Sequence, residues 1–87
     1  MDVQNYTIDF FVSCGYSPSL NMVKNIVESR NDISIYKEEI NDMMGCGEIY
    51  LKGSCAAYKL FLQMSRDIDD PEYWFAVEQL EMAWKTN

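Results

Sequence analysis

Residues 10–18 read FFVSCGYSP, an apolar run that stops at a cysteine and leads through glycine into the start of a helix. Alternating apolar side chains over residues 6–12 predict a strand. Ser17 followed by Pro18 predicts a helix N-cap with proline at the first helical position, where its missing amide costs nothing. Cys14 would then lie at a helix N-terminus, where free amides and the helix dipole favour a thiolate.

A helical interpretation of the same stretch stays open. Val3, Tyr6, Phe10 and Cys14 also fall at helical spacing. Under that alternative the chain would be a small all-α domain.

Composition limits the function classes. A chain of 87 residues is one small domain, residues 1–87. Its net charge is -7, from 14 acids and 7 bases, which argues against nucleic acid or anionic membrane as a partner. The absence of histidine makes Ser-His, Cys-His and zinc-water chemistry improbable. Carboxylates and thiols remain as the groups that could do chemistry.

Three cysteines, Cys14, Cys46 and Cys55, form an odd set without metal-type spacing. This pattern favours a reducing compartment over a secreted disulfide scaffold. No signal peptide or membrane-spanning run is visible in the sequence, so we expect a cytoplasmic protein. The absence of histidine and the spacing of the cysteines predict no metal site.

The middle of the chain gives weaker patterns. The first helix is predicted to end at Asn31 or Asp32, and residues 33–36 to form a short strand, while residues 37–44 fit a strand, a loop or a helical turn. Residues 48–52 predict another strand, with a tight turn at Lys52 and Gly53. Residues 54–62 would be the returning strand of a hairpin, although their alanines and leucines equally suit a helix.

The end of the chain predicts a helix. Asp70 would cap it, Pro71 would take its first position, and Tyr73, Val77, Leu80 and Trp84 follow at helical spacing. Its further apolar side chains exceed what one buried stripe needs, which offers a surface for a partner or a second copy of the chain. These extra side chains are Trp74, Phe75 and Met82.

The predicted order is β-α-β-β-β-α, an α/β sandwich that resembles a small thioredoxin-like fold. Cys14-Gly15-Tyr16 with Pro18 after an apolar strand resembles the selenoprotein W-like (Rdx) family, and residues 14–17 are also similar to the Cys-Gly-Phe-Ser motif of monothiol glutaredoxins. The resemblance implies a thiol-redox protein in which Cys14 takes the second position of the redox motif. Phe11 takes the first, so the family's vicinal disulfide cannot form.

Two function classes follow. In the first, Cys14 reacts alone with glutathione or with a partner's thiols, or pairs with Cys46, which such a fold would place nearby. Tyr16 would then line the substrate surface. In the second, the chain is a non-enzymatic acidic module that binds or inhibits another protein, of the kind phages and viruses use, and has lost the redox motif. Its binding residues would be Asp69, Asp70 and Glu72.

Overall fold

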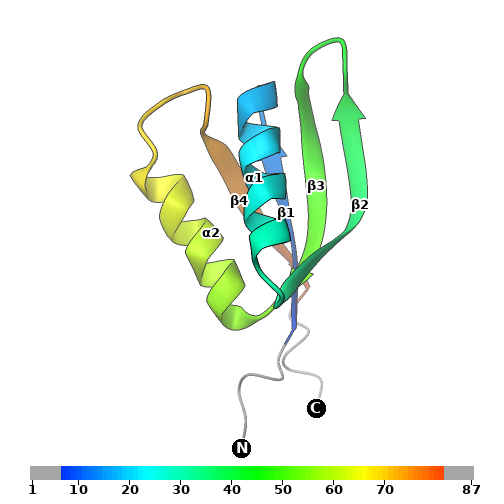
Figure 1. The fold of residues 1–87 in the computed structure, drawn as a ribbon, viewed down its shortest axis with the longest axis vertical. Helices are drawn as coiled ribbons and strands as arrows, with labels where there is room; N and C mark the ends of the chain where they lie inside the picture. The colour runs from blue at the N-terminus through cyan, green and yellow to red at the C-terminus, as the bar shows by residue number, and fades with distance from the viewer. Residues whose placement is uncertain (1–6, 82–87) are drawn as a thin grey trace, which may run out of the picture.

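A computed structural model describes residues 7–81 and forms two layers, a sheet and a pair of helices that cover one of its faces (Figure 1). The elements follow one another as β1 (Ile8–Cys14), α1 (Ser17–Ser29), β2 (Ile33–Asn41), β3 (Cys46–Gly53), α2 (Cys55–Asp67) and β4 (Phe75–Glu81). The mixed α/β class is therefore confirmed, and the all-α alternative is wrong.

The strand β1 organises the sheet. It pairs antiparallel with β3 on one side and with β4 on the other, and the strand order is β2-β3-β1-β4. This β-α-β-β-α-β topology is the split β-α-β, or ferredoxin-like, arrangement. The alternation that predicted β1 is the one observed, because every second residue from Ile8 to Cys14 is buried beneath the helices.

The core between sheet and helices is aromatic. Phe10 contacts Tyr58 and Phe61 of α2, with ring centroids 5.0 and 5.8 Å apart. Phe61 in turn packs against Phe75 of β4 at 5.9 Å. Aromatic contacts of this kind stabilise a small core beyond the area they bury, and they hold α2 over β1 and β4.

The hairpin between β2 and β3 resolves the segment whose conformation the sequence left open. Residues 42–45 form its loop, and the Asn41 side chain accepts hydrogen bonds from the amides of Met43 and Met44 at 3.1 and 3.2 Å. Gly45 closes the loop with a φ of 71°, a conformation that disfavours other residues. β2 is thus longer than predicted, and the turn lies here and not at Lys52 and Gly53.

The helix α2 corrects the predicted returning strand at residues 54–62. Ser54 caps it by accepting a hydrogen bond from the Ala57 amide at 3.1 Å. The sequence carried this signal, a serine before a run of good helix formers, but a serine after glycine also suits a hairpin.

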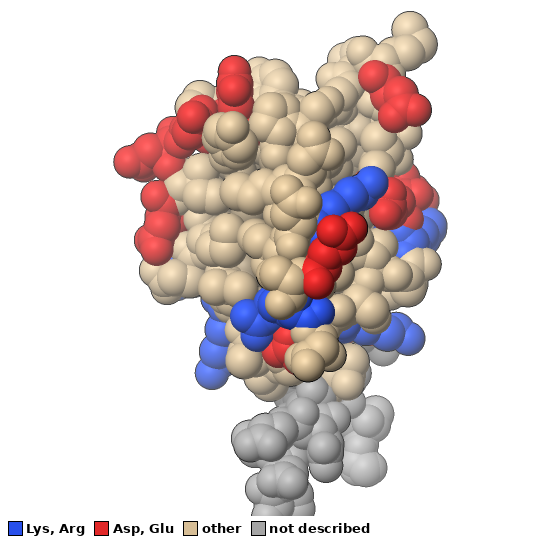
Figure 2. All heavy atoms as spheres, in the orientation of Figure 1, with Lys and Arg blue, Asp and Glu red and all other residues tan. Residues whose placement is uncertain are grey.

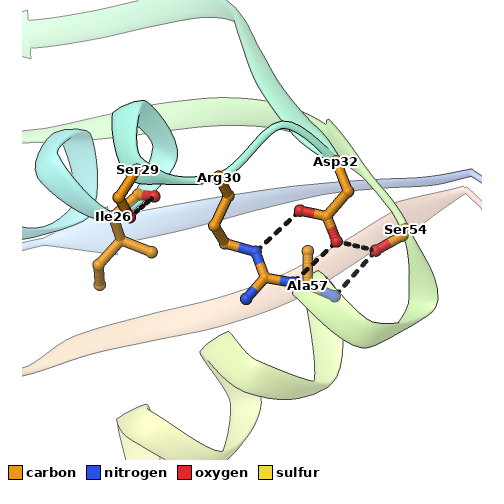
Figure 3. Close-up of polar contacts among 6 residues, drawn as sticks. All are labelled: Ile26, Ser29, Arg30, Asp32, Ser54 and Ala57. Atoms are coloured by element: carbon orange, nitrogen blue, oxygen red, sulfur yellow. Dashed lines mark hydrogen bonds and ion pairs between the residues drawn. The ribbon is translucent and has the colours of Figure 1, made fainter.

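The same serine joins α2 to the turn between α1 and β2 (Figure 3). Its hydroxyl donates to Asp32 Oδ2 at 2.7 Å, and Arg30 donates to both oxygens of the same carboxylate at 2.8 and 2.7 Å. A bidentate guanidinium contact and a hydroxyl donor both favour the charged carboxylate. The pKa of Asp32 is accordingly held well below its usual range, chiefly by Arg30 and then by Ser54.

The strand β4 corrects the predicted C-terminal helix. Asp70 and Pro71 begin a turn, in which the Asp70 carboxylate accepts from the Glu72 amide and the Asp70 carbonyl accepts from the Tyr73 amide, both at 3.0 Å. Asp followed by Pro begins such turns as readily as helices, so the motif did not decide between them. Phe75 is fully buried in the core and is unavailable to a partner or a second copy. Met82 and Trp84 lie outside the described residues.

The helix α1 begins close to its predicted start, with a different cap. Tyr16 occupies the N-cap position without a side-chain hydrogen bond, and Ser17 is the first helical residue. The buried hydroxyl of Ser19 lies 2.7 Å from the Glu72 carbonyl and 3.0 Å from the Trp74 carbonyl. This contact fixes the loop between α2 and β4 against the start of α1. Within residues 7–81, no helix is long and apolar enough to cross a membrane.

Candidate functional site

The end of the sheet at which β1 stops gathers several of the predicted site residues. A hollow of about 540 Å³ opens there, and Cys14, Tyr16, Cys46 and Pro71 are among its lining residues. Tyr16 is 54% exposed. Pro71 stands between Asp70 and Glu72, so the hollow adjoins the acidic loop without being lined by its carboxylates.

The thiol of Cys14 lies on the helix-covered face of the sheet. Only 3% of the residue is exposed. Burial raises the pKa of the Cys14 thiol to about 12. The thiolate expected at this position is therefore disfavoured, because desolvation of the charged form outweighs the attraction of the nearby helix N-terminus.

Cys14 and Cys46 lie on opposite faces of the sheet. Cys14 pairs with Gly47, and paired residues share a face. Cys46 is the neighbour of Gly47 along β3, and neighbours on a strand point to opposite faces. A disulfide requires the two Cβ atoms to point toward each other. The structure thus brings both cysteines to one end of the sheet without orienting them as a redox pair.

The open face of the sheet carries a row of side chains that sequence analysis missed. Strand pairing aligns four residues across the whole sheet, one from each strand, and all four line the hollow: Ala76, Ser13, Glu48 and Glu39. Two small side chains thus adjoin two carboxylates. We call these four residues the hollow row.

The two carboxylates of the hollow row are direct cross-strand neighbours. Like charges in this position repel each other and destabilise the sheet. Each has one polar contact with the next row of the sheet. Lys37 Nζ lies 3.0 Å from Glu39 Oε2, and the Tyr50 hydroxyl donates to Glu48 Oε1 at 3.0 Å. These contacts raise the pKa values of Lys37 and Tyr50. The second oxygen of each carboxylate remains available as an acceptor.

An aromatic row borders the hollow row on the open face. Phe11 stacks on Tyr50 with ring centroids 5.4 Å apart, and Lys37 lies over the Tyr50 ring at 5.0 Å. Phe11, placed where the redox family carries its first motif residue, therefore serves to build this surface. Its side chain points away from Cys14, since the two residues lie on opposite faces of β1.

Acidic side chains concentrate at the same end of the molecule. On the face shown in Figure 2, they lie mostly toward the hairpin tip and the loop between α2 and β4, whereas basic side chains lie mainly toward the other end. We call this region the acidic end and define it by seven residues. They are Glu39, Asp42, Glu48, Asp67, Asp69, Asp70 and Glu72.

Among the described residues, no group of three or more acidic, cysteine or histidine side chains is arranged to hold a metal ion. The charged groups that line the hollow, Glu39 and Glu48, can accept hydrogen bonds from a cationic organic group.

No family model, curated protein or solved structure matches this chain. The resemblance to selenoprotein W-like proteins stays a prediction. It depended in part on an element order that differs from the observed one after residue 54.

Proposed function

We propose that the protein is a non-enzymatic binding module that captures a basic segment of another protein at its acidic end. The observation that carries this proposal is the hollow row. It places the carboxylates of Glu39 and Glu48 beside small side chains on the sheet face opposite the helices, and every charged residue of the described chain that lines the hollow is acidic.

The surrounding charge supports the same partner class. The acidic loop, with Asp69, Asp70 and Glu72, stands beside the hollow, and Ser19 fixes its backbone. A net charge of -7 would steer a basic partner toward this end and repel nucleic acid. A module of this kind could inhibit its target simply by covering a basic surface.

A peptide selection tests this function. A library of random peptides is selected on the immobilised protein at low salt, and the bound sequences are read. We expect enrichment in lysine and arginine, with binding that weakens as salt is added because exposed charge pairs are screened. The reversal variant Asp69→Lys/Asp70→Lys should weaken the selected peptides. Selection of apolar or acidic peptides would rule the proposal out.

Thiol redox chemistry is the second candidate, and one observation favours it: Cys14 and Cys46 line the same hollow. In that case mild oxidation should produce a Cys14 to Cys46 linkage or a glutathione adduct, detected by mass spectrometry. The binding function instead predicts that the wild type captures the same peptides with and without a thiol reductant. The three free cysteines support a reducing location such as the cytoplasm under either function.

A further inference from the structure

The shape of the hollow follows from its residues. Ser13 and Ala76 are paired across β1 and β4, and their short side chains leave the sheet surface low at this point. In the next row the large rings of Phe11 and Tyr50 stack on each other. The depression is therefore built into the strands, and a side chain entering it would meet an ordered surface.

The charge of the hollow selects what enters it. Glu39 and Glu48 face each other across β2 and β3, and among the described residues no lysine or arginine lines the hollow. Lys37 neutralises part of this charge from the neighbouring row, where it also lies over the Tyr50 ring. Since Tyr50 and Lys37 each engage one carboxylate oxygen, both carboxylates can accept further hydrogen bonds.

An arginine side chain fits these features together. Its guanidinium is planar, presents five donors and forms bidentate contacts with carboxylates. Its methylene stem packs on small or apolar surface while the charged head reaches the acceptors. A cation between two facing carboxylates would also relieve their mutual repulsion.

We infer that the hollow receives an arginine side chain from the partner, with the guanidinium at Glu39 and Glu48 and the stem across Ser13 and Ala76. This inference rests on the proposed function and specifies the side chain that the basic segment must present. In this inference the loop acids Asp69 and Asp70 do not contact the arginine but attract the basic segment electrostatically from beside the hollow.

The test is an amide NMR titration of the full chain with three capped tripeptides, Gly-Arg-Gly, Gly-citrulline-Gly and Gly-Lys-Gly. Citrulline keeps the shape of arginine and removes its charge. The arginine peptide should shift the amides of Ser13, Gly47 and Ala76. The citrulline peptide should bind about tenfold more weakly, because charge-assisted hydrogen bonds become neutral ones.

Two variants and a control locate the contact. Ala76→Leu fills the hollow without changing the charge, and Glu48→Gln removes one carboxylate while keeping an acceptor for Tyr50. Each should weaken the arginine peptide about tenfold. Glu28→Gln, on the exposed surface of α1, should leave binding unchanged. The amide spectrum of each free variant reports whether its fold is retained.

The outcomes separate this inference from the proposed function. Equal binding of the arginine and citrulline peptides, or of a lysine peptide and the arginine peptide, would overturn the arginine assignment. Charge-dependent shifts confined to residues 67–72, and unaffected by Ala76→Leu, would overturn the hollow as the site while the acidic end remained a binding surface. Failure of the library to yield basic peptides would instead overturn the proposed function itself.

Discussion

Burial determines what the thiol of Cys14 can do. Its position at the end of β1, shortly before α1, would favour a thiolate in a water-exposed turn, but the side chain points into the core with Ile8, Phe10 and Val12. A charge there would lose its hydration, so the neutral thiol is the stable form. Cys14 therefore acts as a small core side chain that happens to end a strand.

This view predicts slow alkylation of Cys14. In the variant Cys46→Ser/Cys55→Ser, Cys14 is the remaining thiol, and its pKa of about 12 leaves a thiolate population at pH 8 about a thousandfold below that of an unperturbed cysteine. Iodoacetamide should label it slowly in buffer and rapidly in concentrated urea, followed by mass spectrometry. Fast labelling of the folded variant would restore the thiol-redox hypothesis.

The pH dependence of the same residue has a definite sign. Because the folded-state pKa is raised, the contribution of Cys14 to stability is complete below the unfolded pKa and is lost as pH rises from there toward about 12. Urea unfolding of the variant Cys46→Ser/Cys55→Ser at pH 7 and pH 10 tests this sign. The free energy of unfolding should be lower at pH 10.

At the scale of elements, the sequence determined the first half of the fold more clearly than the second. β1 alternates strictly, and Pro18 marks the start of α1 within one residue. The segment of α2 was left open between a strand and a helix, and the helix predicted for the segment of β4 was wrong, because Ser54 and Asp70 can each begin either a helix or a turn. Tertiary packing determines that the first of these segments is a helix and the second a strand, since this arrangement brings Phe61 and Phe75 together to close the core.

The candidate site depended on register, which local patterns do not encode. Cys14, Tyr16 and Cys46 all line the hollow. The expectation for Cys46 came from the resemblance to a thioredoxin-like fold, and strand pairing puts its side chain on the face opposite Cys14. The pairing of Glu39 with Glu48 could not be predicted, since it requires the β2 register, including the irregularity between Ile35 and Lys37. A residue pattern along one strand cannot show what faces it on the next.

The junction of α1, β2 and α2 yields an element-scale prediction. Asp32→Asn removes the ion pair with Arg30 and weakens the bond from Ser54, so it should lower the free energy of unfolding at pH 7 by about 1 kcal/mol. Since the folded pKa of Asp32 is depressed, the wild-type contribution is present above the unfolded value, about 3.9, and is lost as pH falls below it.

Urea unfolding at pH 7 and pH 2.5 measures the effect of Asp32→Asn. The gap between wild type and variant should narrow at the lower pH. Asp67→Asn is the matched control, because its carboxylate contacts only Gln63 one helical turn away among the contacts observed for the described residues. An equal loss of unfolding free energy in both variants would contradict a stabilising role for the Asp32 contacts. So would a difference between wild type and Asp32→Asn that does not change with pH.

At the scale of the whole molecule, the clustering of acidic side chains at one end lowers the stability of the fold through like-charge repulsion. The chain carries a net charge of -7, and many of the acidic side chains lie at the end where β1 stops (Figure 2). A protein selected for stability alone would place a neutral or basic residue opposite Glu48. Under the proposed function, a bound cationic ligand would relieve the repulsion between the facing Glu39 and Glu48.

Glu48→Gln distinguishes a binding role from a structural one, because the two predict opposite changes. The substitution retains an acceptor for the Tyr50 hydroxyl and removes the cross-strand repulsion from Glu39. We expect the variant to be more stable than wild type by about 0.5 kcal/mol, or about 2–4 °C in Tm at low salt, with the difference shrinking as salt is added.

The same variant should bind the arginine peptide less well, so stability and binding should move in opposite directions. Thermal unfolding monitored by circular dichroism at low and high salt measures the first, and the NMR titration measures the second. Glu28→Gln also removes one negative charge, but Glu28 lies on a helix and has no carboxylate across a strand, so this variant separates the local repulsion from the overall charge. If Glu48→Gln destabilised the fold, Glu48 would be a structural residue whose contact with Tyr50 outweighs its repulsion from Glu39, and the pair would lose its significance for binding.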